Sequence, residues 1–117
     1  MSEFLSEAWF ESIADAASSA SAPADLAFTI EQVVEGEPTV RWQVQVLDER
    51  VAIDLHASAE PDVRITTDRH TATEIQAGRT SAQRAFLDGR LRIGGDIQAL
   101  MANRQALADL APALGLT

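Results

Sequence analysis

The 117-residue chain contains no cysteine and no lysine. Without cysteine, it can form no disulfide, no thiolate nucleophile and no cysteine-ligated metal site. Without lysine, it lacks the side chain that forms Schiff bases, acts as an amine base or reaches the phosphates in a phosphate-binding loop. These two absences exclude several classes of enzyme and of cofactor site.

Basic residues are few, and all nine of them are arginines. Eighteen acidic residues outnumber them, so the formal net charge is −9 at pH 7. Such a charge repels phosphate backbones, and we therefore expect no nucleic-acid partner. The first arginine is Arg41, so the basic start of a secretory or organellar signal is missing, and the sequence favours a cytoplasmic protein.

Long apolar runs are absent as well. No run approaches the roughly 20 residues that a membrane-spanning helix needs, so we expect no stable membrane insertion. The apolar share of 46% is nevertheless ordinary for a globular protein. A chain of this length fits one domain over residues 1–117, with a single hydrophobic core.

The first half of the chain shows a helical period followed by three stretches with a period of two. Apolar residues at helical spacing predict an amphipathic helix over residues 4–17, with Ser2 as its cap. Alternating residues separated by turn-forming segments predict an antiparallel meander of three strands. The predicted strands cover residues 26–34, 39–46 and 50–56. In the third strand, Val51, Ile53 and Leu55 are expected to face inward.

The second half predicts a fourth strand over residues 62–67, two short helices, a fifth strand over residues 90–93 and a final helical segment. The residues suited to cap the starts of these helices are Asp68, Thr80 or Ser81, and Asp96. The residues suited to end them are Gly78, Gly89 and Pro112. The predicted layout therefore places helices over one face of a sheet.

Residues that could carry polar chemistry are scattered through the chain. The two histidines, His56 and His70, have no clustered metal ligands around them in sequence, and both occupy positions expected to be exposed. Asp48, Glu49 and Asp54 could in principle form a carboxylate pair, but turns and strand exteriors are where solvated acids usually lie. We therefore expect no metal ion and no catalytic carboxylate pair.

The glycine-rich segment over residues 89–96 invites comparison with a phosphate-binding loop. That loop needs lysine and then serine or threonine after its last glycine, whereas Asp96 follows here. An acidic cap would also occupy the amides that a phosphate needs. No serine lies in the Gly-x-Ser-x-Gly turn of a serine hydrolase. We expect neither catalysis nor a bound cofactor.

The remaining candidate site is apolar and comes from the helix-rich second half. Large apolar residues there form either a packed core or the wall of a cavity, and periodicity does not distinguish the two. The candidate lining residues are Ile75, Phe86, Leu87, Leu91, Ile93, Leu100, Met101, Leu107, Leu110 and Leu114.

The stretch from Thr71 to Asp96 resembles the signature region of the sterol carrier protein 2 family. In that family a helix ends at glycine, an Ala-Phe pair precedes a second glycine, and an apolar strand leads to Gly-Asp. Residues 40–44 and 62–68 are similar to the family too, so the resemblance covers nearly the whole chain. Two departures are Glu49, where members often carry glycine, and the absence of a peroxisomal tail. The missing tail favours a stand-alone bacterial-type member of the family.

This resemblance implies an α/β (α+β) fold with a five-stranded, mainly antiparallel sheet covered by helices, in the order α-β-β-β-β-α-α-β-α. It also implies an apolar tunnel that holds a fatty acid, acyl-coenzyme A, phospholipid or sterol with little selectivity. The expected partner is thus a lipid or another apolar small molecule, and no protein partner is indicated. A monomer and a homodimer both remain open.

Two other functions are compatible with a chain of this kind. The same fold with a filled cavity would serve as an accessory or protein-interaction module. A small enzyme, such as a cone-shaped isomerase or dehydratase, commonly uses tyrosine with a carboxylate, and this chain has no tyrosine. Residues 97–117 could form a mobile lid or a fixed core helix. The carrier interpretation is favoured.

Overall fold

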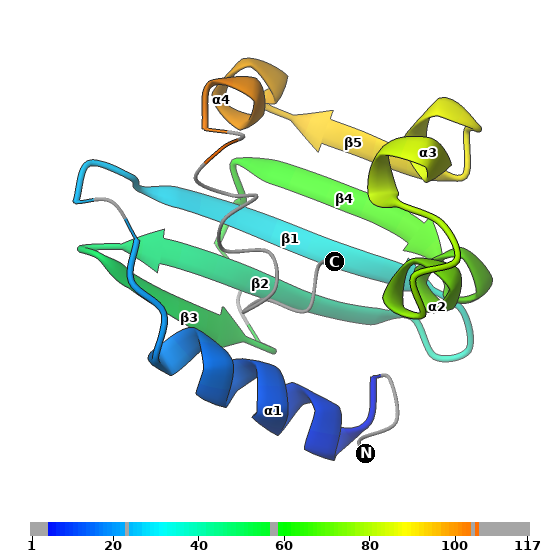
Figure 1. Cartoon of the computed structure of the whole chain (residues 1–117), viewed down its shortest axis with the longest axis horizontal. Coiled ribbons are helices and arrows are strands. Elements are labelled where there is room, and N and C mark those ends of the chain that lie inside the picture. The colour runs from blue at the N-terminus through cyan, green and yellow to red at the C-terminus, as the bar shows by residue number, and fades with distance from the viewer. Residues whose placement is uncertain (1–4, 23, 57–58, 104, 106–117) are drawn as a thin grey trace.

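The structure is a computed structural model that describes residues 5–22, 24–56, 59–103 and 105. The elements are α1 (Glu7–Ser18), β1 (Phe28–Glu35), β2 (Val40–Leu47), β3 (Arg50–Asp54), β4 (Val63–Asp68), α2 (Arg69–Gln76), α3 (Ala82–Leu87), β5 (Leu91–Gly95) and α4 (Ile97–Ala102) (Figure 1). This order confirms the predicted α-β-β-β-β-α-α-β-α layout.

The five strands form one sheet in the order β3-β2-β1-β4-β5. Neighbouring strands are antiparallel except for β1 and β4, which are parallel. The sheet is therefore mainly antiparallel, as expected. Because β4 pairs with β1 and not with β3, the connection after β3 must pass across β2 and β1 before β4 begins. Figure 1 shows α1 beside β3, and α3 and α4 at opposite ends of β5.

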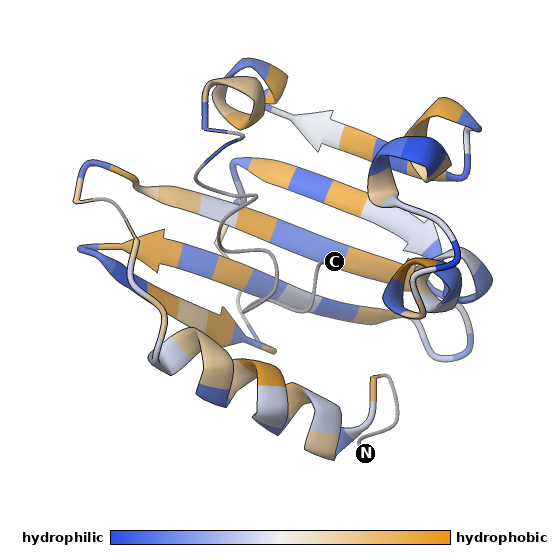
Figure 2. Ribbon diagram, in the orientation of Figure 1, coloured by the Kyte–Doolittle hydropathy of each residue, from blue (hydrophilic) through white to orange (hydrophobic). Residues whose placement is uncertain are grey.

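The two faces of the sheet carry different side chains. By the strand register, Ile30 of β1, Val44 of β2 and Val63 of β4 share one face, and all three belong to the main hydrophobic core. Trp9 and Ile13 of α1 belong to the same core, so α1 covers this face. We call it the covered face. Figure 2 shows apolar and polar residues alternating along the strands, as the period of two predicts.

The start of α1 differs from the prediction. The Oγ atom of Ser6 accepts a hydrogen bond from the backbone N–H of Trp9 at 3.1 Å, and this makes Ser6 the helix cap. Leu5 has a φ angle of 66°, which no α-helix residue adopts, so the helix cannot extend back to residue 4. The predicted cap, Ser2, lies outside the described residues.

The caps of the three later helices confirm the prediction. Their side chains each accept a hydrogen bond from the backbone N–H three residues ahead, at 2.7 to 3.0 Å. These capping residues are Asp68, Ser81 and Asp96. Gly78 and Gly89 follow the ends of α2 and α3 with φ angles of 78° and 77°, as predicted for helix-ending glycines. Helix α4 ends at Ala102; Pro112 lies outside the described residues.

The ends of all five strands differ from the predicted limits by one or two residues. β1 begins at Phe28 and not at Leu26, and β5 covers Leu91–Gly95. β3 ends at Asp54, and Leu55, predicted to face inward, is exposed. The carboxylate of Asp54 accepts a hydrogen bond from the backbone N–H of His56 at 2.9 Å, and this Asx turn ends the alternation.

Candidate functional site

The covered face carries a cluster of three aromatic rings under α1. The rings of Trp9, Phe10 and Trp42 pack edge to face, with centroids 5.0 to 5.7 Å apart. Trp9 belongs to the buried stripe of α1, while Trp42 belongs to the even-numbered residues of β2 that face this helix. The cluster therefore forms the α1 end of an apolar layer between helix and sheet.

Two polar side chains lie within this apolar layer. Gln32 of β1 and Trp42 of β2 are direct partners in the strand register, and Ile65 of β4 is the partner of Gln32 on its other side. Gln32 is 8% exposed and Trp42 is 4% exposed. The Nε1 atom of Trp42 is buried, and no described residue gives it a hydrogen-bond partner. The carboxamide of Gln32 makes no hydrogen bond within the described part of the chain.

The sequence prediction did not include these residues, because it drew the site from the second half of the chain alone. The alternation of Trp42 with Arg41 and Gln43 was a usable signal for its inward direction. The pairing of Gln32 with Trp42 depends on the register of β1 with β2, for which the turn between these two strands was the available signal.

The predicted lining residues are distributed over four elements. The described ones lie on α2 (Ile75), α3 (Phe86 and Leu87), β5 (Leu91 and Ile93) and α4 (Leu100 and Met101). Three further ones, Leu107, Leu110 and Leu114, lie outside the described residues.

The structure brings some of these residues to the core and leaves others at the surface. Ile93 and Leu100 are half-buried and pack against the main core, and Leu91 is buried. Ile75 is half-buried on α2. By contrast, the three most exposed members are Phe86 (49%), Leu87 (72%) and Met101 (54%). A role for all of them around one ligand stays a prediction.

The opposite face of the sheet holds a buried polar cluster. The carboxylate of Glu31 accepts hydrogen bonds from Arg64 Nε and Gln43 Nε2, and Gln43 Nε2 also donates to the Ala59 carbonyl at 2.8 Å. The hydrogen bond to Glu31 raises the pKa of Arg64 above its ordinary value. Ala59 belongs to the connection between β3 and β4, so the hydrogen bond from Gln43 holds this connection against the sheet.

A groove of about 450 Å³ lies beside this cluster on the same face. Val33 contributes an apolar side chain to it, and Arg41, Glu60 and Arg92 contribute charged ones. Arg92 already forms an ion pair with Glu35 at 3.0 Å. Because both signs of charge line the groove, it has no clear preference for a cation or an anion.

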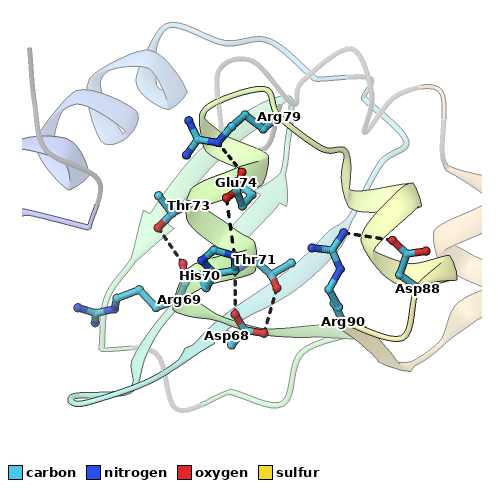
Figure 3. A network of polar contacts seen from close by, with 9 residues as sticks. All are labelled: Asp68, Arg69, His70, Thr71, Thr73, Glu74, Arg79, Asp88 and Arg90. Atoms are coloured by element: carbon cyan, nitrogen blue, oxygen red, sulfur yellow. Dashed lines mark hydrogen bonds and ion pairs between the residues drawn. The ribbon is translucent and has the colours of Figure 1, made fainter.

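Two groups of ion pairs lie near α2 and α3 (Figure 3), one in α2 and the loop after it, the other in the turn between α3 and β5. The carboxylate of Glu74 accepts a hydrogen bond from Arg79 and lies 3.7 Å from His70 Nε2. Asp88 pairs with Arg90 at 3.2 Å, and these groups border a surface groove of about 470 Å³. The bond from Arg79 lowers the pKa of Glu74, so that this carboxyl is ionised at neutral pH and has no proton to donate as an acid.

The acidic residues that the sequence offered as a carboxylate pair form turns in the structure. Asp48 and Glu49 form the turn between β2 and β3, and Asp54 ends β3 through its bond to the N–H of His56. Over the described ranges, no three histidine, aspartate or glutamate side chains are grouped so that they could hold a metal ion. No helix in those ranges is both long and apolar enough to cross a membrane.

Comparison with solved structures shows the fold to be that of sterol carrier proteins. A crystal structure of sterol carrier protein 2 has a TM-score of 0.73 and 21% sequence identity, covering 97% of this chain and 98% of that one. A protein of Thermus thermophilus, whose description suggests a sterol carrier protein, has a TM-score of 0.70 and 21% identity, covering 97% and 88%. At these identities the likeness establishes the fold alone.

A third similar structure is that of a palmitated SCP2L2 protein of Aedes aegypti, with a TM-score of 0.58 and 20% identity. It covers 74% of this chain and 75% of that one. A search of curated protein sequences finds no match. The sequence model of the SCP-2 sterol transfer family, however, matches residues 8–108. The match spans most of the chain, which therefore belongs to the SCP-2 sterol transfer family.

Proposed function

We propose that the protein binds an apolar lipid between the covered face of the sheet and its helices. The ligand class in this proposal is a fatty acid, acyl-coenzyme A, phospholipid or sterol, and the lining residues are those predicted from the sequence. The observation that carries the proposal is the family match over residues 8–108. The exposed apolar side chains of Phe86, Leu87 and Met101 support it, because such side chains often border ligand-binding surfaces.

The binding force in this proposal is the burial of apolar surface. Moving an acyl chain from water into an apolar cavity gains about 0.8 kcal/mol per methylene, hence on the order of 10 kcal/mol for a long chain. Association and ordering of the chain cost several kcal/mol, which leaves roughly micromolar affinity. Burial of apolar surface has no direction, so this force by itself does not distinguish lipids of different headgroups, and a bound lipid leaves chemically unchanged. We further propose that this carrier acts in the cytoplasm and moves lipid between sites there.

Two linked measurements test lipid binding. Native mass spectrometry of the purified protein reports any lipid that co-purifies, and titration of the delipidated protein with a fluorescent fatty-acid analogue reports new uptake. We expect either a bound mass or saturable uptake of one probe per chain. A protein that carries no lipid and takes up no probe would contradict the proposal.

A further inference from the structure

The indole N–H of Trp42 differs from most of the buried polar side chains. Gln43 donates a hydrogen bond to the Ala59 carbonyl, Thr67 to the Arg90 carbonyl and Thr71 to Asp68. Trp42 Nε1 has no hydrogen-bond partner among the described residues, although Trp42 is only 4% exposed. A buried donor without a partner costs about 1 to 3 kcal/mol, so its persistence calls for an explanation.

Gln32 places a second polar group at the same spot. It lies directly across from Trp42 on the covered face, so their β-carbons are separated by about 5 Å. The carboxamide offers two donors and one acceptor. Ile65 on the neighbouring strand and Ile30 and Val34 on the same strand surround it on this face. The pair therefore forms a polar spot on the mainly apolar covered face, where Thr67 already donates its hydrogen bond to the Arg90 carbonyl.

We propose that this spot binds an oxygen atom of the lipid. The oxygen accepts hydrogen bonds from Trp42 Nε1 and from the carboxamide of Gln32, while the hydrocarbon part packs on the apolar side chains around them. This inference rests on the proposed lipid-binding function and adds the polar contact that it lacks. A lipid bound in this way enters with its oxygen-bearing end against the sheet.

The charge distribution selects an uncharged oxygen. Every charged residue of the five strands lies on the opposite face by register. The strand residues of the covered face thus include no cation to pair with a carboxylate or phosphate, and burying an unpaired anion is costly. A hydroxyl group or an ester carbonyl needs no counter-charge. The favoured ligand class is therefore a fatty alcohol, a sterol or an esterified acyl chain.

Nuclear magnetic resonance of the two indole groups tests the contact directly. The chain has only two tryptophans, so the ¹⁵N-labelled protein gives two indole N–H signals, which Trp9→Phe and Trp42→Phe assign. We expect the Trp42 signal to shift downfield and to exchange more slowly when the protein is loaded with hexadecanol. Loading with hexadecane, which has no oxygen, should not shift the Trp42 signal in this way. Native mass spectrometry confirms that each probe is bound.

Affinity measurements provide a second test of the polar contact. Loss of one hydrogen bond predicts that Gln32→Met and Trp42→Phe each weaken hexadecanol binding about 3- to 10-fold and leave hexadecane binding unchanged. Gln45→Met is the matched control, because Gln45 lies on β2 but on the opposite face. Palmitate should bind more tightly as the pH falls, because its carboxyl group then becomes neutral.

The outcomes separate this inference from the proposed function. Bound hexadecanol with an unchanged Trp42 signal would overturn the polar contact while lipid binding stands. So would equal losses for hexadecanol and hexadecane in Gln32→Met. Failure to take up any probe would overturn lipid binding itself, and the contact with it. The signals of the unsubstituted protein decide the matter even if Trp42→Phe does not fold.

Discussion

Gly95 lies against the main chain of Asp62, at the point where β5 passes the start of β4. A β-carbon at position 95 would lie 2.4 Å from the Asp62 carbonyl oxygen and 3.1 Å from the α-carbon of Val63. The same carbonyl accepts a hydrogen bond from the N–H of Asp96 at 2.8 Å. Gly95 thus allows the close approach that carries β5 into α4, which explains the Gly-Asp pair in chemical terms.

Gly95→Ala should be strongly destabilising. Gly95 has a φ angle of 97°, so alanine adds backbone strain to the contact with Asp62, and we expect a loss of about 2 to 4 kcal/mol. Gly94→Ala is the matched control, because a β-carbon there meets nothing within 4 Å. Urea denaturation gives both free energies of unfolding. Equal losses for the two variants would show that the close approach to Asp62 is unimportant.

Glu49→Gly should stabilise the protein. Asp48 and Glu49 have φ angles of 53° and 67°, as in the two-residue hairpin turns that favour glycine at the second position. Removing the β-carbon relieves strain of about 1 to 2 kcal/mol, and the greater freedom of glycine in the unfolded chain offsets part of it, leaving a gain of about 0.5 to 1 kcal/mol. Thermal unfolding tests this. Glu49→Ala keeps the β-carbon and should show no such gain; an equal gain would contradict the turn argument.

Asp68→Ala should destabilise the start of α2 in a pH-dependent way. The backbone N–H of Thr71 donates to the Asp68 carboxylate, and this bond lowers the pKa of Asp68. A lowered pKa means that the stabilisation is complete above the pKa of the unfolded chain, about 4, and is lost as the pH falls through the lower folded value. At pH 7 the loss of the cap should cost about 1 kcal/mol.

Urea denaturation at a series of pH values measures this difference. The gap between the original protein and Asp68→Ala should narrow on acidification, because protonated Asp68 no longer presents a full carboxylate to the N–H. Asp68→Asn retains a capping oxygen without the charge and should therefore show a smaller and nearly pH-independent loss. A gap for Asp68→Ala that stays constant down to strongly acidic pH would contradict the role of the ionised cap.

Phe86→Ala tests the predicted lining residues. If Phe86 contacts the lipid, its removal should weaken binding of a fluorescent fatty-acid analogue by about 1 kcal/mol, or roughly fivefold. Leu47→Ala is the control, since Leu47 is an exposed apolar residue at the end of β2, away from α3. Equal effects of the two substitutions on the dissociation constant would remove Phe86 from the proposed site.

Local sequence signals determined the types and order of the elements. The alternation around Trp42 predicts β2, and Asp68, Ser81 and Asp96 each cap the helix that follows. Such signals succeed because strand alternation and helix capping depend on residues one to four positions apart. Predictions of element ends were weaker. Ser2 and Ser6 are the same residue type and suit the cap position equally well. Only the backbone conformation of Leu5 makes Ser6 the cap.

The tertiary structure alone decided which distant residues meet. Gln32 faces Trp42 because of the β1–β2 register, and Glu31 meets Arg64 because β4 lies parallel to β1. A slip of one residue in either pairing would exchange the two faces of a strand, and no local turn sets the register of β1 with β4. The sequence by itself thus determined the elements, their order and a family resemblance. The long-range pairing of strands determined that an unpaired indole and a carboxamide share the covered face.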